Sequence, residues 1–267
     1  MSDADGAVLE ALGPLVASAV EEIEPSRAQR YEATIATAHG DWTLLEEGDV
    51  LAVAPSAGHA AKAILARSRE RAFELAALKG WVRLHGALVD LGGSRILLIG
   101  PPGSGKSALA LALALRGGSI QGDESLLVRG RDAVAVSAPL ALAEPEAHQA
   151  IAAAAAAGAG CGGWSSARTP EGRALLDPAR DLGMEWRLTI APLDHVVALD
   201  PRPGRARARP TTPVEMLSEI AARLPVETPP RPALMRALAG ALAGASCHRL
   251  SVGEAGARED AVIGLVC

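Results

Sequence analysis

The chain has 267 residues, of which 49% are hydrophobic, 21% charged and only 2% aromatic, and its formal net charge is −5. This length allows a sizeable core, and the composition is that of ordinary globular proteins, which excludes fibrous and highly charged classes. The scarcity of aromatic side chains and the negative charge argue against nucleic acids and anionic membranes as partners. The cysteines, Cys161, Cys247 and Cys267, lie too far apart to predict a disulfide framework or a zinc site.

The N-terminal part of the chain predicts a small α+β module at residues 1–80. Residues 31–37 alternate in a strand-like way, and the runs 42–45 and 50–53 flank an acidic turn as in a hairpin. Apolar residues at helical spacing then predict a long helix at residues 57–78.

A second hairpin is predicted around the turn Gly92–Gly93. Strand-forming residues fill both 81–91 and 94–99, and two glycines between them suit a tight turn. Counting outward from the turn pairs Asp90 with Arg95, and their opposite charges favour this register.

The same count places His85 next to the segment that follows the second strand. Gly86 comes opposite Ile99, and His85 comes opposite Gly100. A histidine in that position can donate to a phosphate or a carboxylate, although a histidine in a strand can equally be a structural residue. The position makes His85 a candidate for the active site.

Residues 100–107 match the phosphate-loop motif G-x-x-x-x-G-K-[ST] at every fixed position. The apolar strand 95–99 leads into the loop and the helical run 108–116 leads out, so backbone N–H groups and a helix N-terminus should converge on an anion. The alternative is a glycine-rich turn before an ordinary helix. We expect Lys106 to reach the β- and γ-phosphates of ATP and Ser107 to offer its hydroxyl to Mg²⁺. The predicted nucleotide-binding residues are Gly100, Pro101, Pro102, Gly103, Ser104, Gly105, Lys106, Ser107 and Ala108.

An acidic pair, Asp123 and Glu124, is predicted to return to the level of this loop. The helix 104–116 would lead about 20 Å away at 1.5 Å per residue. Glycines at 117–118 end it, and a strand of about six residues would lead back over a similar length. One carboxylate could then act as a base toward an incoming hydroxyl and the other could bind Mg²⁺. The alternative is an acidic pair on a solvated turn.

The third section of the chain, from residue 139 onward, begins with a stretch rich in Ala, Gly and Pro that extends to residue 178 and that we expect to be partly mobile. A strand is expected at 195–199 and helices at about 213–224 and 233–243, the first of them capped by Thr211 or Thr212. Short strands are expected near the end of the chain.

Three further groups of polar residues were considered. An extended segment would project Arg205, Arg207 and Arg209 from one face, where they could hold an acidic substrate or a transferring phosphoryl group, although a solvated face is the simpler interpretation. Asp194 and His195 begin a strand and could form a second metal or base pair, but no further ligand spacing supports this. A third group, Arg67, Arg69 and Arg71, is not expected to form a phosphate cradle, because residues two apart on a helix do not face each other.

The segments 84–90, 98–107 and 115–117, followed by the acids at 123–124, resemble the HPr kinase/phosphorylase family and its wider HPr-kinase-like relatives. In that family the corresponding sequence reads His-Gly, a phosphate loop, Arg-Gly and Asp-Asp, in the same order and at similar spacing. The resemblance implies an α/β fold in which a P-loop HPr-kinase-like catalytic domain at residues 81–267 follows the smaller N-terminal module, with ATP and Mg²⁺ as its cofactors.

Carried over residue by residue, the resemblance gives Asp123 the role of the catalytic Asp, which accepts the proton of a serine hydroxyl. Lys106 and Ser107 would serve the phosphates and Mg²⁺, and His85 would be the active-site histidine. Glu124 departs from the family's second Asp but keeps a carboxylate, so we expect it to bind Mg²⁺.

The resemblance implies an ATP-dependent serine kinase that acts on a protein or a ribosomally made peptide. The family's C-terminal sequence for dephosphorylation is not found here, so phosphorylase activity is not carried over. Relatives that lack it include enzymes that phosphorylate serine on peptides, lasso peptides among them. One alternative is a P-loop ATPase, which the closeness of Asp123 to Lys106 disfavours; the other is a nucleotide-sensing module without phosphoryl transfer.

A cytoplasmic location is expected. No apolar run reaches the roughly 18 residues that a membrane span needs, and the acidic start of the chain does not resemble a signal peptide. Assembly into homo-oligomers is left open.

Overall fold

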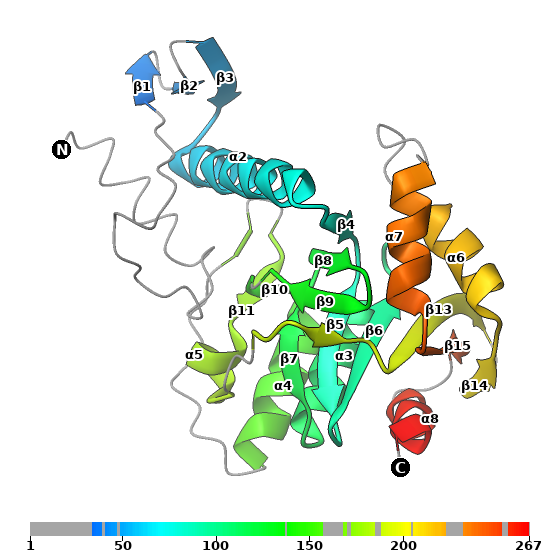
Figure 1. Ribbon diagram of the computed structural model, residues 1–267. Coiled ribbons are helices and arrows are strands. Elements are labelled where there is room, and N and C mark those ends of the chain that lie inside the picture. Colours follow the sequence, from blue (N-terminus) through cyan, green and yellow to red (C-terminus); the bar gives the residue numbers. More distant parts are fainter. Residues whose placement is uncertain are drawn as a thin grey trace.

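The computed structural model describes residues 34–38, 41–46, 49–136, 138–156, 168–169, 172–184, 188–203, 205–222, 232–252 and 256–266. These residues form a mixed α/β structure whose strands make four sheets (Figure 1), which confirms the expected α/β class. None of the helices in these ranges is both long and apolar enough to cross a membrane. Three predicted features, the strand residues 31–33, Cys161 and Cys267, lie outside the described residues.

The N-terminal module consists of a three-stranded antiparallel sheet and one long helix. The helix covers the residues predicted for it, and the hairpin between the second and third strands is confirmed. The helix packs closely on the sheet because the side chains at their contact are small and buried: Ala54 from β3, and Ala60 and Ala61 from the helix. The division between domains at residue 80 stays a prediction. The bounds are β1 (Thr34–Ala38), β2 (Asp41–Glu46), β3 (Asp49–Ala54) and α2 (Ala57–Leu78).

The largest sheet has six strands in the order β14-β15-β13-β6-β5-β7. β6, β13 and β15 are parallel, whereas β5, β7 and β14 run antiparallel to the strands beside them. The predicted pairing of Asp90 with Arg95 is confirmed. The bounds are β5 (Ala87–Leu91), β6 (Ser94–Ile99), β7 (Ser119–Gly122), β13 (His195–Pro203), β14 (Arg207–Pro210) and β15 (Ser246–Val252).

Both faces of this sheet are covered. Side chains alternate along β6, so that Ile96 and Leu98 enter a core shared with α3 and α8, while Leu97 enters one shared with a second sheet and with α6 and α7. The second sheet has the order β12-β9-β8-β4. The bounds are β4 (Val82–Leu84), β8 (Leu126–Arg129), β9 (Asp132–Ala135), β12 (Ala191–Pro192), α3 (Lys106–Leu115), α6 (Pro213–Ala221), α7 (Pro232–Leu242) and α8 (Ala257–Val266).

A third core lies on the outer side of α3. There Leu111 and Ala114 pack against a two-stranded sheet and two helices, so the described residues of the Ala-rich stretch after residue 139 form regular structure. Small alanines at Ala147, Ala150 and Ala154 are the buried positions of its longer helix. The bounds are β10 (Leu140–Leu142), α4 (Glu144–Ala156), β11 (Ala174–Leu176) and α5 (Pro178–Leu182).

Two expectations for the C-terminal part are corrected. Near its end the chain has one strand and a helix, β15 and α8, where short strands were expected. The helix is favoured because Val262 is buried in the core between α8 and the sheet. β13 continues to Pro203, beyond the expected end at residue 199. The predicted start of α6 is confirmed: Thr212 caps it in a capping box with Glu215.

Candidate active site

The phosphate loop joins the end of β6 to the start of α3, as predicted. Its backbone needs glycine where it turns: Gly103 has φ 75° and Gly105 has φ 86°, both in the left-handed region. Gly100 is needed for a different reason, because a Cβ there would lie 2.6 Å from Ser104 Oγ. The loop is therefore held in a shape in which backbone N–H groups can face an anion.

Lys106 is buried at the first turn of α3, with only 6% of its surface exposed. Its Nζ donates hydrogen bonds to the carbonyl oxygens of Gly100 and Pro101, at 3.1 and 3.2 Å. The ammonium group is thus held over the loop by weak neutral acceptors. Phosphate oxygens are stronger, charged acceptors and could take their place.

The acidic pair follows β7, which is four residues long, shorter than the six expected. β7 leads back along β5 to the level of Leu88, and the pairing shifts by one residue between Leu88 and Val89. Gln121 falls at this irregularity, and its side-chain amide donates to Asp90 Oδ2 at 2.8 Å. A bulge of this kind bends the strand end and redirects the residues that follow it.

The bend buries one acid and exposes the other. Asp123 is only 4% exposed, whereas Glu124 is exposed. Glu124 has φ 69°, and within the described ranges no other non-glycine residue has a positive φ. Such backbone costs about 1 to 3 kcal/mol and is characteristic of functional sites, where surrounding structure maintains it.

A single cavity of about 290 Å³ brings the predicted site residues together. It adjoins the loop and the N-terminus of α3, and both members of the acidic pair line it. Asp123 and Lys106 therefore line one cavity, as the predicted return of the acidic pair requires, whereas their roles stay predictions. The predicted residues that line the cavity are His85, Pro102, Gly103, Gly105, Lys106, Ser107, Ala108, Asp123 and Glu124.

His85 lies beside the loop because of the residue that follows it. A Cβ on Gly86 would come within 2.7 Å of the carbonyl oxygen of Leu98, so only glycine allows this close approach of the two chain segments. Regular pairing ends two residues earlier than the count predicts, with Ala87 opposite Leu98. His85 is exposed at the cavity wall, where its ring is accessible to a ligand.

Three further residues at the site were not singled out from the sequence. Glu146 of α4 and Arg173, which precedes β11, line the same cavity. Arg258 of α8 lies against the loop, since a Cβ on Gly105 would be 3.0 Å from its Nη1. All three reach the site through long-range packing, and only their charge could have drawn attention to them.

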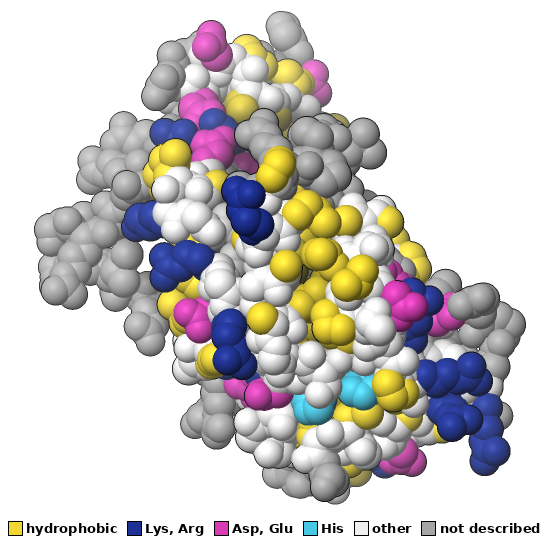
Figure 2. Space-filling model, turned by 45° about the vertical axis from the view of Figure 1, so that its right-hand side comes forward, with side chains coloured by type: hydrophobic (Ala, Val, Ile, Leu, Met, Phe, Trp, Pro, Cys, Tyr) yellow, Lys and Arg dark blue, Asp and Glu magenta, His cyan; other side chains and the backbone are white. Residues whose placement is uncertain are grey.

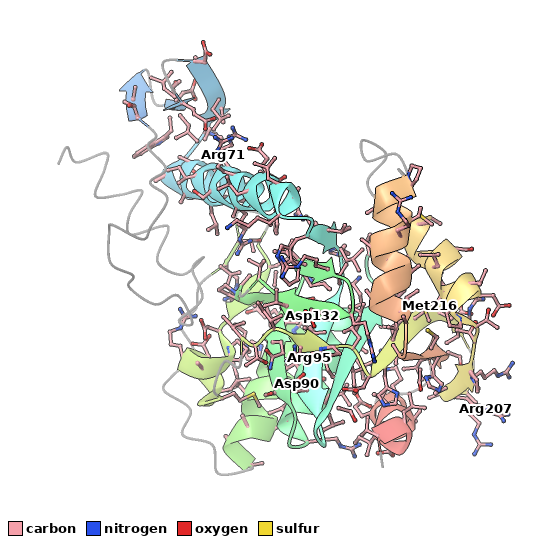
Figure 3. The ribbon with its side chains drawn as sticks, viewed as in Figure 1. Arg71, Asp90, Arg95, Asp132, Arg207 and Met216 are labelled. Carbon is pink, nitrogen blue, oxygen red and sulfur yellow. The ribbon has the colours of Figure 1, made fainter. Side chains whose placement is uncertain are left out.

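Three basic residues in β14 and just before it lie outside the lining of the cavity. Arg205, Arg207 and Arg209 are exposed and line none of it, in agreement with the solvated interpretation. Arg207 points away from the molecule in Figure 3, and Figure 2 shows basic side chains standing out on the side that carries β14.

Asp194 and His195 are also remote, because they lie at the start of β13, the end opposite to the phosphate loop. Asp194 Oδ2 accepts a hydrogen bond from the backbone N–H of Arg95 at 2.7 Å, a structural role. The ring of His195 lies 6.1 Å from that of His248, whose pKa is lowered by burial and by its histidine neighbour. No group of three or more His, Cys, Asp or Glu side chains that could hold a metal ion by themselves occurs in the described part of the chain.

The residues in the cavity suit Mg²⁺ with a nucleoside triphosphate. The Ser107 hydroxyl and the carboxylates of Asp123 and Glu124 are oxygen ligands of the kind that Mg²⁺ prefers, and this ion usually takes only one or two carboxylates together with phosphate oxygens. Ser104 Oγ is buried within the loop without a hydrogen-bond partner among the described residues. A phosphate oxygen next to the loop would give it one.

Gly122→Ala should disturb the site through packing, because Gly122 precedes Asp123 and lies tightly against Ala135 and Val136. A Cβ at this position would lie 2.6 Å from Ala135 Cβ and 3.1 Å from the carbonyl oxygen of Val136, and neither atom can move without its backbone. We expect a loss of about 1 to 3 kcal/mol in the free energy of unfolding and reduced activity, because Asp123 would shift. Denaturant unfolding measures the first effect, and the rate of phosphoryl transfer measures the second.

Gly264→Ala in α8 is the matched control for that substitution. Nothing lies within 4 Å of a Cβ there, so replacing a helical glycine should stabilise the protein by about 0.5 to 1 kcal/mol. Equal stability of both variants would contradict the close approach at Gly122.

Comparisons with known proteins add little to this geometry. No family model matches the chain, and no curated protein matches it. Among solved structures, the chain is similar to the Hpr(Ser) kinase/phosphatase from Coxiella burnetii, with 11% sequence identity over 69% of this chain and 95% of that one and a TM-score of 0.36. A likeness of this size does not bear on the peptide acceptor expected from the sequence, and the functional argument rests on the residues of the site.

Proposed function

We propose that the protein is an ATP-dependent kinase that transfers the γ-phosphoryl group to a serine hydroxyl of a protein or a ribosomally made peptide. One observation carries the proposal: the phosphate-loop lysine, Lys106, and a buried carboxylate, Asp123, line the same cavity. An acid in that position can take the proton of a hydroxyl that attacks the terminal phosphate, a task that nucleotide binding alone does not include.

In the proposed reaction the serine oxygen forms a bond to the γ-phosphorus as the bond from that phosphorus to the β–γ bridging oxygen breaks, and ADP leaves. Asp123 orients the hydroxyl and takes its proton. Lys106 stabilises the negative charge on the phosphate oxygens. Mg²⁺, when bound, neutralises charge on the phosphates, and Ser107 and Glu124 are the residues proposed to hold it.

Asp123 is suited to this task by its surroundings. Its side-chain carboxylate makes no hydrogen bond or ion pair with another described residue. Only its backbone carbonyl oxygen is engaged, because it accepts a hydrogen bond from the N–H of Ser125. The carboxylate is therefore available to an incoming hydroxyl. The proposed role for His85, on the same cavity wall, is to donate to a phosphate or to this carboxylate.

The test is incubation with Mg·ATP and candidate acceptors, namely the proteins and peptides encoded beside this one, followed by mass spectrometry. We expect one acceptor to gain a phosphate on serine, with one ADP formed for each phosphate transferred. Nucleotide binding without a phosphorylated product would favour a nucleotide-sensing module, and ADP release without an acceptor would favour an ATPase.

A further inference from the structure

A second cavity, about 480 Å³ in volume, lies between α2 and the sheet β10–β11. We call it the α2 groove. Lys62 and Arg69 line it from the helix, and Pro139 and Thr169 line it from the other side. In Figure 1 α2 lies across the molecule above β10 and β11, so the N-terminal module forms one wall of this groove.

The α2 groove is continuous with the active-site cavity. Three residues, Glu124, Ala141 and Arg173, line both. Glu124 and the buried Asp123 are consecutive, so a molecule in the groove would have one end at the proposed catalytic base. The groove thus occupies the position from which an acceptor would approach the nucleotide.

The lining of the groove is predominantly basic. Four basic side chains, of Lys62, Arg69, Arg83 and Arg173, face two acidic ones, of Glu70 and Glu124. Arg83 is already engaged within the protein. It donates to Glu70 and to Ser125 Oγ, and its guanidinium lies 4.0 Å from the centre of the Phe73 ring.

Arg69 and Arg173 are different. Neither side chain makes a hydrogen bond or an ion pair with any other described residue. Arg69 is partly buried, and burial lowers the pKa of its guanidinium, while Glu124 acts in the opposite direction and Arg83 adds to the lowering. Among the described residues, both arginines therefore have no such partner, and both line the groove, Arg173 at the end that it shares with the active-site cavity.

We propose that the α2 groove binds the acceptor, and that the acceptor is a peptide segment with acidic residues beside its serine. This inference rests on the proposed kinase function. Arginine forms paired, charge-assisted hydrogen bonds with carboxylates, so Arg69 and Arg173 would each engage an Asp or Glu side chain.

The size and lining of the groove favour a peptide over a small acidic metabolite. The α2 groove is larger than the active-site cavity that it joins, and the apolar side chains of Leu65, Ala66 and Leu175 lie among its basic ones. A small metabolite would occupy only the end near Arg173. A peptide segment would use the whole length, with its acidic side chains on the arginines and its apolar ones between them.

The experiment uses two labelled peptides of equal length, each with one central serine, flanked by Asp and Glu in one and by Lys in the other. Their affinity for the full chain is measured by fluorescence anisotropy in the presence of Mg·ADP, so that no transfer occurs. We expect the acidic peptide to bind about tenfold more tightly or better. The acidic-to-basic ratio should fall several-fold in Arg69→Ala and in Arg173→Ala, and Arg69→Lys should keep part of it.

Arg71→Ala is the matched control, because Arg71 lies on the same helix but pairs with Glu74 and does not line the groove. Its ratio should stay within about twofold of the unmodified protein. Since the ratio compares two peptides on one preparation, a partly unfolded variant does not alter it.

The inference is overturned if the two peptides bind equally, if neither binds, or if Arg71→Ala lowers the ratio as much as Arg69→Ala. Failure of the kinase proposal gives a different result: the acidic peptide binds in the groove, but with Mg·ATP its serine gains no phosphate. Transfer to the lysine-flanked serine as readily as to the acidic one would sustain the kinase and overturn the acidic preference.

Discussion

Asp123→Asn is expected to lower the rate of phosphoryl transfer by about a thousandfold while ATP still binds, because a general base typically contributes between about 10² and 10⁴ to the rate. The amide has the shape of the carboxylate but cannot take the serine proton. Asp123 is buried and makes no side-chain hydrogen bond to the described residues, so the substitution breaks no internal contact. Single-turnover transfer and equilibrium binding of a labelled nucleotide give the two quantities separately.

Glu146→Gln is the control for the loss of charge. Glu146 lines the same cavity from α4 and also accepts a hydrogen bond from the backbone N–H of Ala143. Gln also removes one negative charge from the lining of the cavity but leaves the proposed base in place. We therefore expect a much smaller loss of rate. If the two variants lost the same activity, or if Asp123→Asn transferred phosphate at the normal rate, Asp123 would not be the base.

The sequence predicted those parts of the site that depend on neighbours in the chain. The Asp90–Arg95 pairing follows from a two-residue glycine turn and opposite charges, and the structure has that register. The phosphate loop needs only a strand, its glycines and a helix, and these occur consecutively. The return of Asp123 to the level of the phosphate loop was predicted because the helix that leads away and the strand that leads back have nearly equal lengths. The strand is two residues shorter than expected, and this difference is too small to move Asp123 out of the cavity.

Features that depend on distant contacts were not predictable in this way. The bulge at Gln121 is set by the amide's contact with Asp90, 31 residues away, and by the tight fit of Gly122 against β9. Arg258 comes to the phosphate loop only because α8 packs beside α3, and the apolar residues of α8 suit a strand equally well. The position of Arg69 in the α2 groove depends on the packing of α2, which forms one wall of that groove.

The strained conformation of Glu124 connects the fold to the proposed chemistry. It comes directly after a bulged strand whose position is set by Gln121 and Asp90, and Asp90 is in turn paired with Arg95. Packing of the sheet therefore holds the acidic pair in its unusual conformation. This chain of contacts predicts that a substitution at Arg95, outside the cavity, would affect the site as well as stability.

Arg95→Met should destabilise the protein by about 3 kcal/mol, the lower end of the cost of breaking a buried, hydrogen-bonded ion pair, because the side chain of Asp90 is itself 28% exposed. Arg95 is only 4% exposed, and its guanidinium forms two hydrogen bonds to the carboxylate of Asp90, at 2.9 and 3.0 Å. It also donates to the carbonyl oxygens of Ala133, Thr189 and Ala191. Figure 3 shows Asp90 and Arg95 side by side within the molecule.

These bonds join two sheets, since Asp90 and Arg95 belong to the six-stranded sheet, whereas Ala133 in β9 and Ala191 in β12 belong to the second sheet. Methionine keeps the length and apolar character of the stem but leaves every one of these acceptors without its donor, and buried acceptors without donors are costly. A fall in the melting temperature on the order of 10 °C is expected for a chain of this size. Differential scanning calorimetry measures it.

Arg207→Met is the control, since Arg207 is exposed on β14 and its loss should change the free energy of unfolding by no more than about 0.5 kcal/mol. Because Asp90 also accepts a hydrogen bond from Gln121, the Arg95 variant should transfer phosphate more slowly even at temperatures where it is fully folded. A stability change as small as that of the Arg207 variant would show that these bonds contribute little, and normal transfer by the folded variant would show that the acidic pair does not depend on them.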